Sequence, residues 1–169
     1  MAKRYPIKDW KRVEPKFRLD IEPYRPPDIG PYAYIWDIDG TVAHMTGCSP
    51  YDYSRVSEDE PDPYVRALFW DIQEAQPMIR RLFVSGRSDD CRNVTAKWLP
   101  SKGFNSDELF MCKAGDDRDD AVVKLEIFNE HIRDNYNVLG VFDDRDRVVS
   151  MWRRLGLKCF QKASGGFLI

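Results

Sequence analysis

Two aspartates separated by one residue follow an apolar run in the first quarter of this 169-residue chain. Asp37 and Asp39 belong to the segment Asp-Ile-Asp-Gly-Thr, which comes directly after residues 33–36. The run predicts a buried strand, and a period of two puts both carboxylates on the same side of the chain. Gly40 then allows the backbone to turn away. Carboxylates at a strand end can bind a metal ion, and one of them can attack a phosphate.

Three further segments carry residues that suit a phosphate group. Hydroxyl groups, backbone amides and guanidinium groups donate hydrogen bonds to phosphate oxygens, and a lysine supplies a positive charge. Because the carboxyl ends of parallel strands meet at one edge of a sheet, we expect these residues to lie beside the two aspartates. They are Ser85, Gly86 and Arg87 after residues 80–85, Lys124 in a helix that begins near Asp119 and Asp120, and Asp143 with Asp144 after residues 137–142.

Four carboxylates at one sheet edge, from Asp37, Asp39, Asp143 and Asp144, would repel one another unless a cation lay among them. Hard oxygen ligands favour Mg²⁺, which keeps several waters and binds a substrate phosphate oxygen. The four cysteines are widely spaced without a Cys-x-x-Cys pair, which argues against zinc. The sequence therefore predicts a magnesium site.

Each of these residues has a more ordinary interpretation when it is taken alone. An Asp before a helix is usually a cap, a Ser after a strand is usually a turn residue, and a helical Lys usually faces solvent. The order of the motifs makes them specific, because Asp-x-Asp-Gly-Thr, Ser-Gly-Arg, a helical Lys and Asp-Asp each follow a predicted strand.

The elements that must position these residues alternate along the chain, which is typical of β-α units around a parallel sheet. Stripes of apolar residues with helical period lie between short apolar runs. We therefore predict an α/β fold with a Rossmann-like parallel sheet of about five strands and helices on both faces. Strands are expected over residues 33–38, 80–85, 109–112, 137–142 and 157–161, with helices around residues 65–72, 91–98, 122–132 and 148–155.

The chain divides into an arm, residues 1–31, and a single domain, residues 32–169. The arm is rich in Pro and charge, with eight Lys or Arg against five Asp or Glu in its first 30 residues. We expect it to be extended and solvated, with contacts to a phosphodiester backbone and its bases as the alternative. Residues 41–62 form a small loop insert, and a candidate lid, in place of a large cap domain.

Composition limits the class of protein. With 43% hydrophobic residues the chain suits one domain with a full core. Its apolar runs are short and its basic start precedes no apolar segment, so neither a membrane helix nor a signal peptide is expected. We expect a cytoplasmic protein that does not bind membranes. A net charge of −2 excludes binding to nucleic acid through bulk electrostatics alone.

In its motifs the chain resembles the haloacid dehalogenase superfamily of phosphotransferases, through Asp37 and Asp39, Ser85, Lys124, and Asp143 with Asp144. It is more closely similar to the 3′-phosphatase domain of the bacteriophage polynucleotide kinase-phosphatase family, over roughly residues 33–167. Shared segments are Gly47 with residues 50–52, residues 120–128, residues 143–154 and residues 163–165. The family's kinase domain is not expected within this sequence, which has no P-loop.

This resemblance implies a Mg²⁺-dependent phosphatase that hydrolyses the terminal 3′-phosphates of DNA or RNA through an aspartyl-phosphate, in nucleic acid repair. It implies nucleic acid 3′ ends as substrate and a separate kinase or ligase as partner. A phosphatase of mononucleotides or other small phosphomonoesters is the alternative. The implied roles are Asp37 as nucleophile, Asp39 as general acid and base, Ser85, Gly86, Arg87 and Lys124 as phosphate ligands, Lys124 also as a catalytic residue, Asp37, Asp39, Asp143 and Asp144 as metal ligands, and Asp120 as support outside the metal shell.

One position departs from the family. Cys48 stands where the phage proteins have an arginine, directly after the glycine that matches Gly47. The departure leaves three interpretations open: Arg55 or another basic group replaces that arginine, the substrate preference differs, or the fold persists as a binding protein without catalysis.

Overall fold

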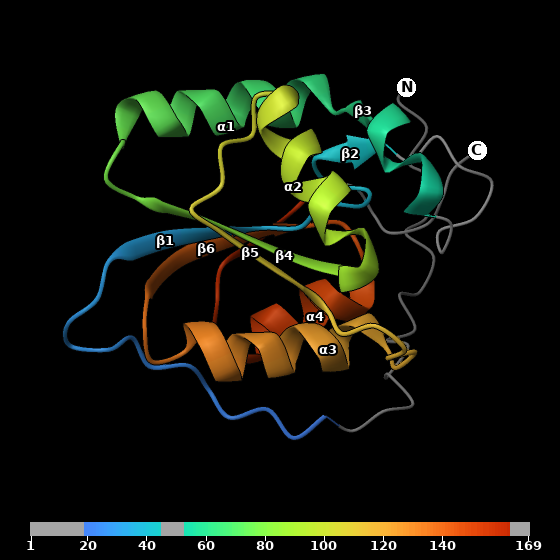
Figure 1. Ribbon diagram of the computed structural model, residues 1–169. Coiled ribbons are helices and arrows are strands. Elements are labelled where there is room, and N and C mark those ends of the chain that lie inside the picture. Colours follow the sequence, from blue (N-terminus) through green and yellow to red (C-terminus); the bar gives the residue numbers. More distant parts are fainter. Residues whose placement is uncertain (1–18, 45–52, 163–169) are drawn as a thin grey trace, which may run out of the picture.

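The computed structural model describes residues 19–44 and 53–162. Its centre is a five-stranded sheet of order β5-β4-β1-β6-β7, in which every pair of neighbours is parallel (Figure 1). The predicted α/β Rossmann-like fold is confirmed, and its last strand begins two residues later than expected. The strands are β1 (Tyr32–Trp36), β4 (Arg80–Ser88), β5 (Glu108–Cys112), β6 (Asn137–Asp143) and β7 (Cys159–Gln161).

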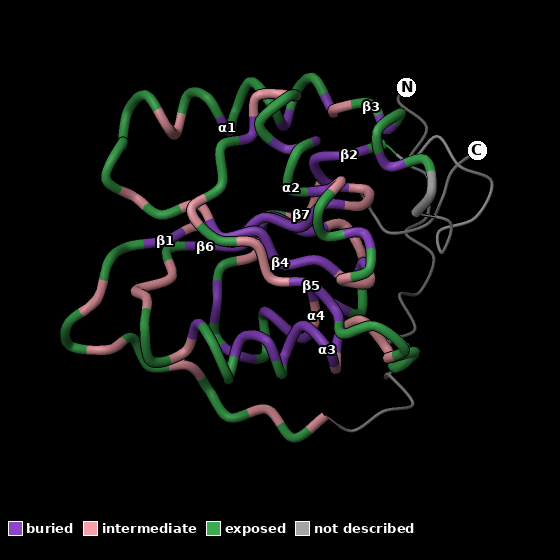
Figure 2. Tube along the Cα trace, in the orientation of Figure 1, coloured by how far each residue is buried: buried purple, intermediate pink, exposed green. Residues whose placement is uncertain are grey.

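Helices cover both faces of this sheet, as Figure 1 shows. On one face lie α1 (Pro63–Ala75) and α2 (Arg92–Ser101), and on the other lie α3 (Asp120–Ile127), a π-helical turn (Phe128–Ile132) and α4 (Asp146–Arg154). Successive side chains of β1 alternate between the two cores: Ile35 packs with the α3 and α4 residues, and Trp36 with those of α1 and α2. Figure 2 shows that burial concentrates in the sheet and the inward faces of the helices.

Caps and glycines define where several helices begin and end. The carboxylate of Asp62 accepts hydrogen bonds from the backbone N–H groups of Tyr64 and Val65 at 3.0 and 2.9 Å, so it caps α1. After α2 and α4 the chain turns at Gly103 and Gly156, whose φ angles are +92° and +90°. Such angles favour glycine, which explains why both residues stop their helices.

The insert contains more structure than the loop predicted for residues 41–62. Its described part includes a short antiparallel pair, β2 (Ala43–His44) with β3 (Glu60–Pro61), and a 3₁₀ helix (Tyr53–Glu58). The indole N–H of Trp98 in α2 donates to the carbonyl oxygen of Asp59 at 2.9 Å, which fixes the insert on α2. Cys48, Gly47 and residues 50–52 lie outside the described residues, so the interpretations based on them stay predictions.

Residues 19–31 cross the surface of the domain without helix or strand. Most of these residues are exposed and none is fully buried, but three apolar side chains contact the domain. Leu19, Ile21 and Tyr24 pack against the core beneath α3 and α4, and the Tyr24 hydroxyl donates to the carbonyl oxygen of Tyr136 at 2.6 Å. Contact of these apolar side chains with the core therefore holds residues 19–31, which we call the strap, on the domain. Residues 1–18 lie outside the described part of the chain.

None of the helices in the described residues is both long and apolar enough to cross a membrane.

Candidate active site

The carboxyl ends of β1, β4 and β6 bring Asp37, Ser85 and Asp143 to one edge of the sheet, as their parallel order requires. Directly after β1 the backbone N–H of Asp37 donates to the carbonyl oxygen of Phe142 at 2.9 Å, which extends the β1-β6 pairing into the site. Gly40 then turns the chain with φ +85°, and a Cβ there would lie 2.2 Å from Oδ2 of Asp144. Only glycine fits both the turn and the neighbouring carboxylate.

Lys124 of α3 bridges two of the strand-end carboxylates. Its Nζ donates to Oδ1 of Asp37 at 2.6 Å and to Oδ2 of Asp143 at 2.9 Å, and all three side chains are almost fully buried. Thr41 donates to the other oxygen of Asp37 at 3.1 Å, and the indole N–H of Trp152 donates to Asp143 at the same distance. Burial alone would lower the pKa of Lys124, but the two carboxylates raise it well above its usual value. The lysine is therefore a fixed positive charge.

The side chains of Asp37, Asp143 and Asp144 can each offer an oxygen within 4.8 Å of the others. Burial raises the pKa of Asp37 despite Lys124, and Asp143 and Asp144 raise it further. Burial and the charge of Asp143 likewise raise the pKa of Asp144, whose buried Oδ1 has no hydrogen-bond partner among the described residues. One lysine does not balance three acidic groups, and one of their buried oxygens has no hydrogen-bond partner among the described residues. This donor set fits a hard divalent cation.

Asp39 is held outside this cluster by Arg87. The guanidinium contacts both carboxylate oxygens of Asp39, with Nε 2.9 Å from each and Nη2 2.5 Å from Oδ1, and Nη2 also lies 2.7 Å from Oδ2 of Asp59. Its side chain is fully buried and does not line the adjoining cavity. Binding of a phosphate by Arg87 stays a prediction, because Nε and Nη2 contact two carboxylates while the buried Nη1 has no hydrogen-bond partner among the described residues. The contacts of Nε and Nη2 fix the orientation of Asp39.

Ser85 and Gly86 lie near the carboxyl end of β4. Ser85 is buried, and its hydroxyl accepts the backbone N–H of Arg87 at 3.1 Å. Gly86 lines the cavity, packed against the carboxylate of Asp120, which forms an ion pair with Arg145. The alternative of Asp120 as the helix cap is wrong, because the side chain that caps α3 is that of Asp119, which accepts from the N–H of Ala121 at 3.0 Å.

Replacing Gly86 by alanine is expected to lower the rate of catalysis with little loss of stability. The new Cβ would lie 2.6 Å from Oδ1 of Asp120, and the ion pair with Arg145 resists movement of that carboxylate. The strain then displaces the backbone that lines the cavity, and a displacement of that kind costs about 10²-fold in rate. Steady-state kinetics beside thermal unfolding measures both effects. Full activity in Gly86→Ala would show that this backbone does not position substrate.

A cavity of about 550 Å³ opens at this edge of the sheet. Asp37, Asp39 and Gly86 line this cavity. Three arginines also line it, one from the segment before α3 and two from the start of α4. Each arginine is at least 40% exposed and pairs with an acidic neighbour, so the rim is polar without a net basic charge. Sequence analysis assigned these residues no role, although one of them directly follows Asp143-Asp144 and a second lies two residues further on. The arginines are Arg118, Arg145 and Arg147.

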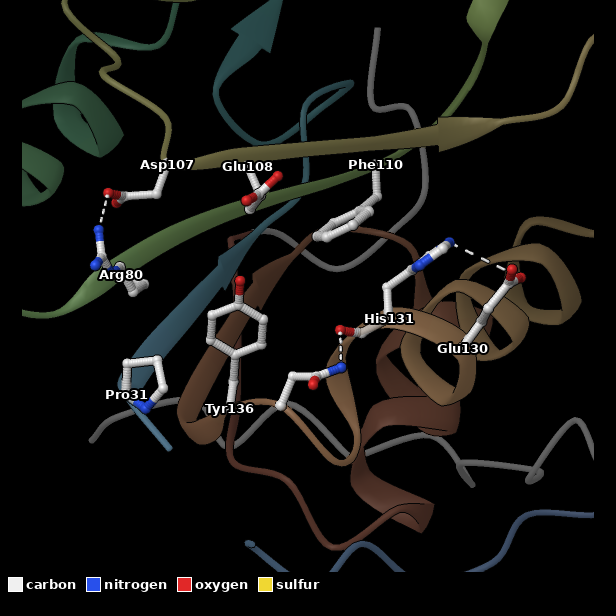
Figure 3. A pocket seen from close by; sticks show the side chains of 9 residues that line it. Pro31, Arg80, Asp107, Glu108, Phe110, Glu130, His131 and Tyr136 are labelled. Carbon is white, nitrogen blue, oxygen red and sulfur yellow. Dashed lines mark hydrogen bonds and ion pairs between the residues drawn. The ribbon is translucent and has the colours of Figure 1, made fainter. Parts of the chain in front are cut away.

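A second groove, of about 540 Å³, lies at the opposite edge, where β4 and β5 begin (Figure 3). Phe110 and His131 stack in it with ring centroids 5.1 Å apart, and Arg80 pairs with Asp107 at 3.0 Å. Its lining includes none of the strand-end carboxylates, so this groove is separate from the candidate active site.

The parallel sheet and its lysine-bridged carboxylates are those of a haloacid dehalogenase phosphatase, a hydrolase of phosphate esters. Residues 31–167 match the family model of the polynucleotide kinase PNKP phosphatase domain, and the chain belongs to that family.

Known relatives are longer than this chain. It is 41% identical over 131 residues to a protein described as a bifunctional polynucleotide kinase/RNA ligase from Autographa californica nuclear polyhedrosis virus, covering 76% of this chain and 19% of that protein. Two solved structures of Pnkp1/Rnl/Hen1 complexes, one described as an RNA repair complex, each contain a similar chain with a TM-score of 0.78. Identities are 35% and 31%, with 85% and 99% of this chain and 46% and 58% of the other chain covered. The chain thus spans about a fifth to three fifths of these relatives.

Proposed function

We propose that this chain is a magnesium-dependent phosphatase that removes terminal 3′-phosphates from DNA or RNA through an aspartyl-phosphate intermediate. The observation that carries the proposal is the buried Lys124 bridge between Asp37, which lines a cavity, and Asp143, in a chain of the PNKP phosphatase family. A carboxylate needs no activating base to act as a nucleophile, and Lys124 favours its charged form. Asp37 is the carboxylate in that position.

The residues present fit the metal ion that this family implies. Asp37, Asp143 and Asp144 would hold it with their side chains. By resemblance to the superfamily, the backbone carbonyl oxygen of Asp39 would be a further ligand. The ion would balance the surplus negative charge of these groups and of a phosphate oxygen. Asp120, paired with Arg145, supports the Gly86 backbone from outside this shell.

The protein groups divide the remaining chemistry among themselves. Asp37 attacks phosphorus as the bond from phosphorus to the sugar oxygen breaks, and Asp39 protonates that oxygen. Asp39 then takes a proton from the water that hydrolyses the aspartyl-phosphate. The Gly86 amide, the Ser85 hydroxyl and Lys124 stabilise the charge on the phosphate oxygens in the loose transition state.

Arg87→Lys is expected to lower kcat by about 10- to 100-fold while changing KM little. The guanidinium orients Asp39 through two nitrogens, whereas an ammonium cannot reproduce this forked contact. Misplacement of a general acid affects the chemical step more than substrate binding. Steady-state kinetics on a 3′-phosphorylated oligonucleotide measures the split between the two constants. Arg92→Lys, an exposed arginine in α2, serves as control, and a rise in KM without a fall in kcat would assign Arg87 to binding instead.

We also propose that the phosphatase serves a kinase or a ligase that is separate from this chain or joined to it. The relatives support this association, because one is described as a kinase/ligase and two lie in complexes with Rnl and Hen1.

The decisive experiment compares phosphate release from an oligonucleotide with a 3′-phosphate, its 5′-phosphate counterpart and a 3′-mononucleotide, with Mg²⁺ or with chelator. We expect selective release from the 3′-phosphorylated oligonucleotide that chelator abolishes. Preference for the mononucleotide would transfer the function to small phosphomonoesters, and absence of release from every substrate would overturn the proposal.

A further inference from the structure

Lys162, the residue that follows β7, contacts three segments around the candidate active site. Its Nζ donates to the carbonyl oxygen of Gly40 at 2.8 Å and lies at the same distance from Oδ2 of Asp62. Its backbone N–H donates to the carbonyl oxygen of Asp143 at 3.2 Å. One lysine thus joins the turn after the Asp37-Asp39 pair, the end of the insert and the end of β6.

The partner carboxylate, Asp62, is itself held on several sides. Oδ1 caps α1, while Oδ2 contacts both Lys162 and Nε2 of His44, the latter at 2.9 Å. The Asp62 backbone N–H donates to the carbonyl oxygen of Val42 at 2.9 Å. Burial alone would raise the pKa of Asp62, but hydrogen bonds, foremost that from Lys162, hold it at about 2. Asp62 therefore carries its negative charge at neutral pH.

Lys162 lies next to the candidate active site but does not line its cavity. It is 20% exposed at the side chain and is not among the residues that line the cavity. The Gly40 turn to which it donates lies one residue beyond Asp39 and packs against the carboxylate of Asp144. Next to Lys162, the Gln161 side chain donates to the carbonyl oxygen of Asp144 at 3.0 Å. The end of β7 thereby holds the two loops that supply the acidic cluster.

We propose that Lys162 is a positioning residue that, through Gly40 and Asp62, couples the insert to the turn carrying Asp37 and Asp39. The inference rests on the proposed function, because that function makes the placement of these aspartates matter for rate. Loss of the ammonium leaves the Gly40 carbonyl and the buried Asp62 carboxylate without their common partner. The turn and the insert then move independently, and Asp37 is less often in line with phosphorus.

The kinetic test uses Lys162→Met, Asp62→Asn, both substitutions together, and Lys162→Arg, with Lys158→Met as the matched control. Lys158 is exposed and lies four residues earlier in the chain. Lys162→Met is expected to lower kcat by about 10- to 100-fold with KM within about twofold. Lys162→Arg recovers most of the loss, and the double variant is no slower than Lys162→Met, since the two residues act as one unit. A kcat for Lys162→Met equal to that of Lys158→Met would overturn the proposal.

Amide hydrogen exchange gives a readout that needs no activity. In Lys162→Met, residues 38–44 and 60–66 are expected to exchange at least about tenfold faster together, and in Lys158→Met they are expected to exchange at the original rate. Unchanged exchange in both segments would also overturn the coupling. Faster exchange in a protein that releases no phosphate from any substrate would uphold the coupling and overturn the proposed function. If Lys162→Met does not fold, the same two readouts on Asp62→Asn decide.

Discussion

Asp37→Asn is expected to lower phosphate release by more than about 10³-fold while the protein stays folded. Asparagine keeps the shape of the side chain, including an oxygen that can accept from Thr41 or Lys124, but it is not a nucleophile for phosphorus. Burial and the neighbouring Asp143 and Asp144 disfavour charge at this position. A neutral side chain relieves that repulsion, so the midpoint of thermal unfolding without metal is expected to stay equal or rise.

The measurement pairs phosphate release from a 3′-phosphorylated oligonucleotide with thermal unfolding of the same preparation. Asp71→Asn, an exposed substitution in α1, is the control and should alter neither quantity. Activity of Asp37→Asn within about tenfold of the original protein would remove Asp37 from the nucleophile's role. A large fall in the unfolding midpoint would show that its charge is structural.

Local patterns in the sequence were sufficient to predict the sheet edge that carries the site. Apolar runs before Asp37, Ser85 and Asp143 identify three parallel strands, and the carboxyl ends of such strands meet. Lys124 follows Asp120 by four residues, or about one helical turn, so it lies on the face of α3 that turns toward the sheet. The roles of these residues in catalysis remain predictions that the variants above test.

The acceptors that the side chains of Arg87 and Lys162 contact could not be predicted from such local patterns. Arg87 reaches Asp59, 28 residues away, and Lys162 reaches Gly40, 122 residues away. No periodicity links such pairs, because only the packing of the insert and of β7 brings them together. Arg87 illustrates the consequence, because the Ser-Gly-Arg segment suggests a phosphate ligand but does not reveal that Asp59 of the insert contacts the guanidinium. The contacts of the strap could not be predicted for the same reason. Leu19, Ile21 and Tyr24 pack against the core, but their spacing follows neither helical nor strand periodicity.

Lys124→Met is expected to destabilise the protein by about 3–5 kcal/mol and to remove most of its activity. Methionine fills a similar volume, but it leaves Asp37 and Asp143 buried without the ammonium that contacts both. Two uncompensated carboxylates in a buried site are far more costly than the loss of an exposed ion pair, which contributes about 0–1 kcal/mol. The substitution thus tests whether Nζ of Lys124 contributes to both stability and catalysis.

Urea unfolding of Lys124→Met, with and without Mg²⁺, separates the two contributions of that charge. A bound cation replaces part of the missing positive charge, so the variant is expected to bind Mg²⁺ more tightly. At the same Mg²⁺ concentration, Mg²⁺ is therefore expected to stabilise the variant by more than it stabilises the original protein. Lys97→Met, an exposed substitution in α2, should show neither the loss nor the enhanced response. A loss in the free energy of unfolding below about 1 kcal/mol would mean that water already screens the two carboxylates. The site would then not be a buried centre in which Lys124 offsets the charges of Asp37 and Asp143.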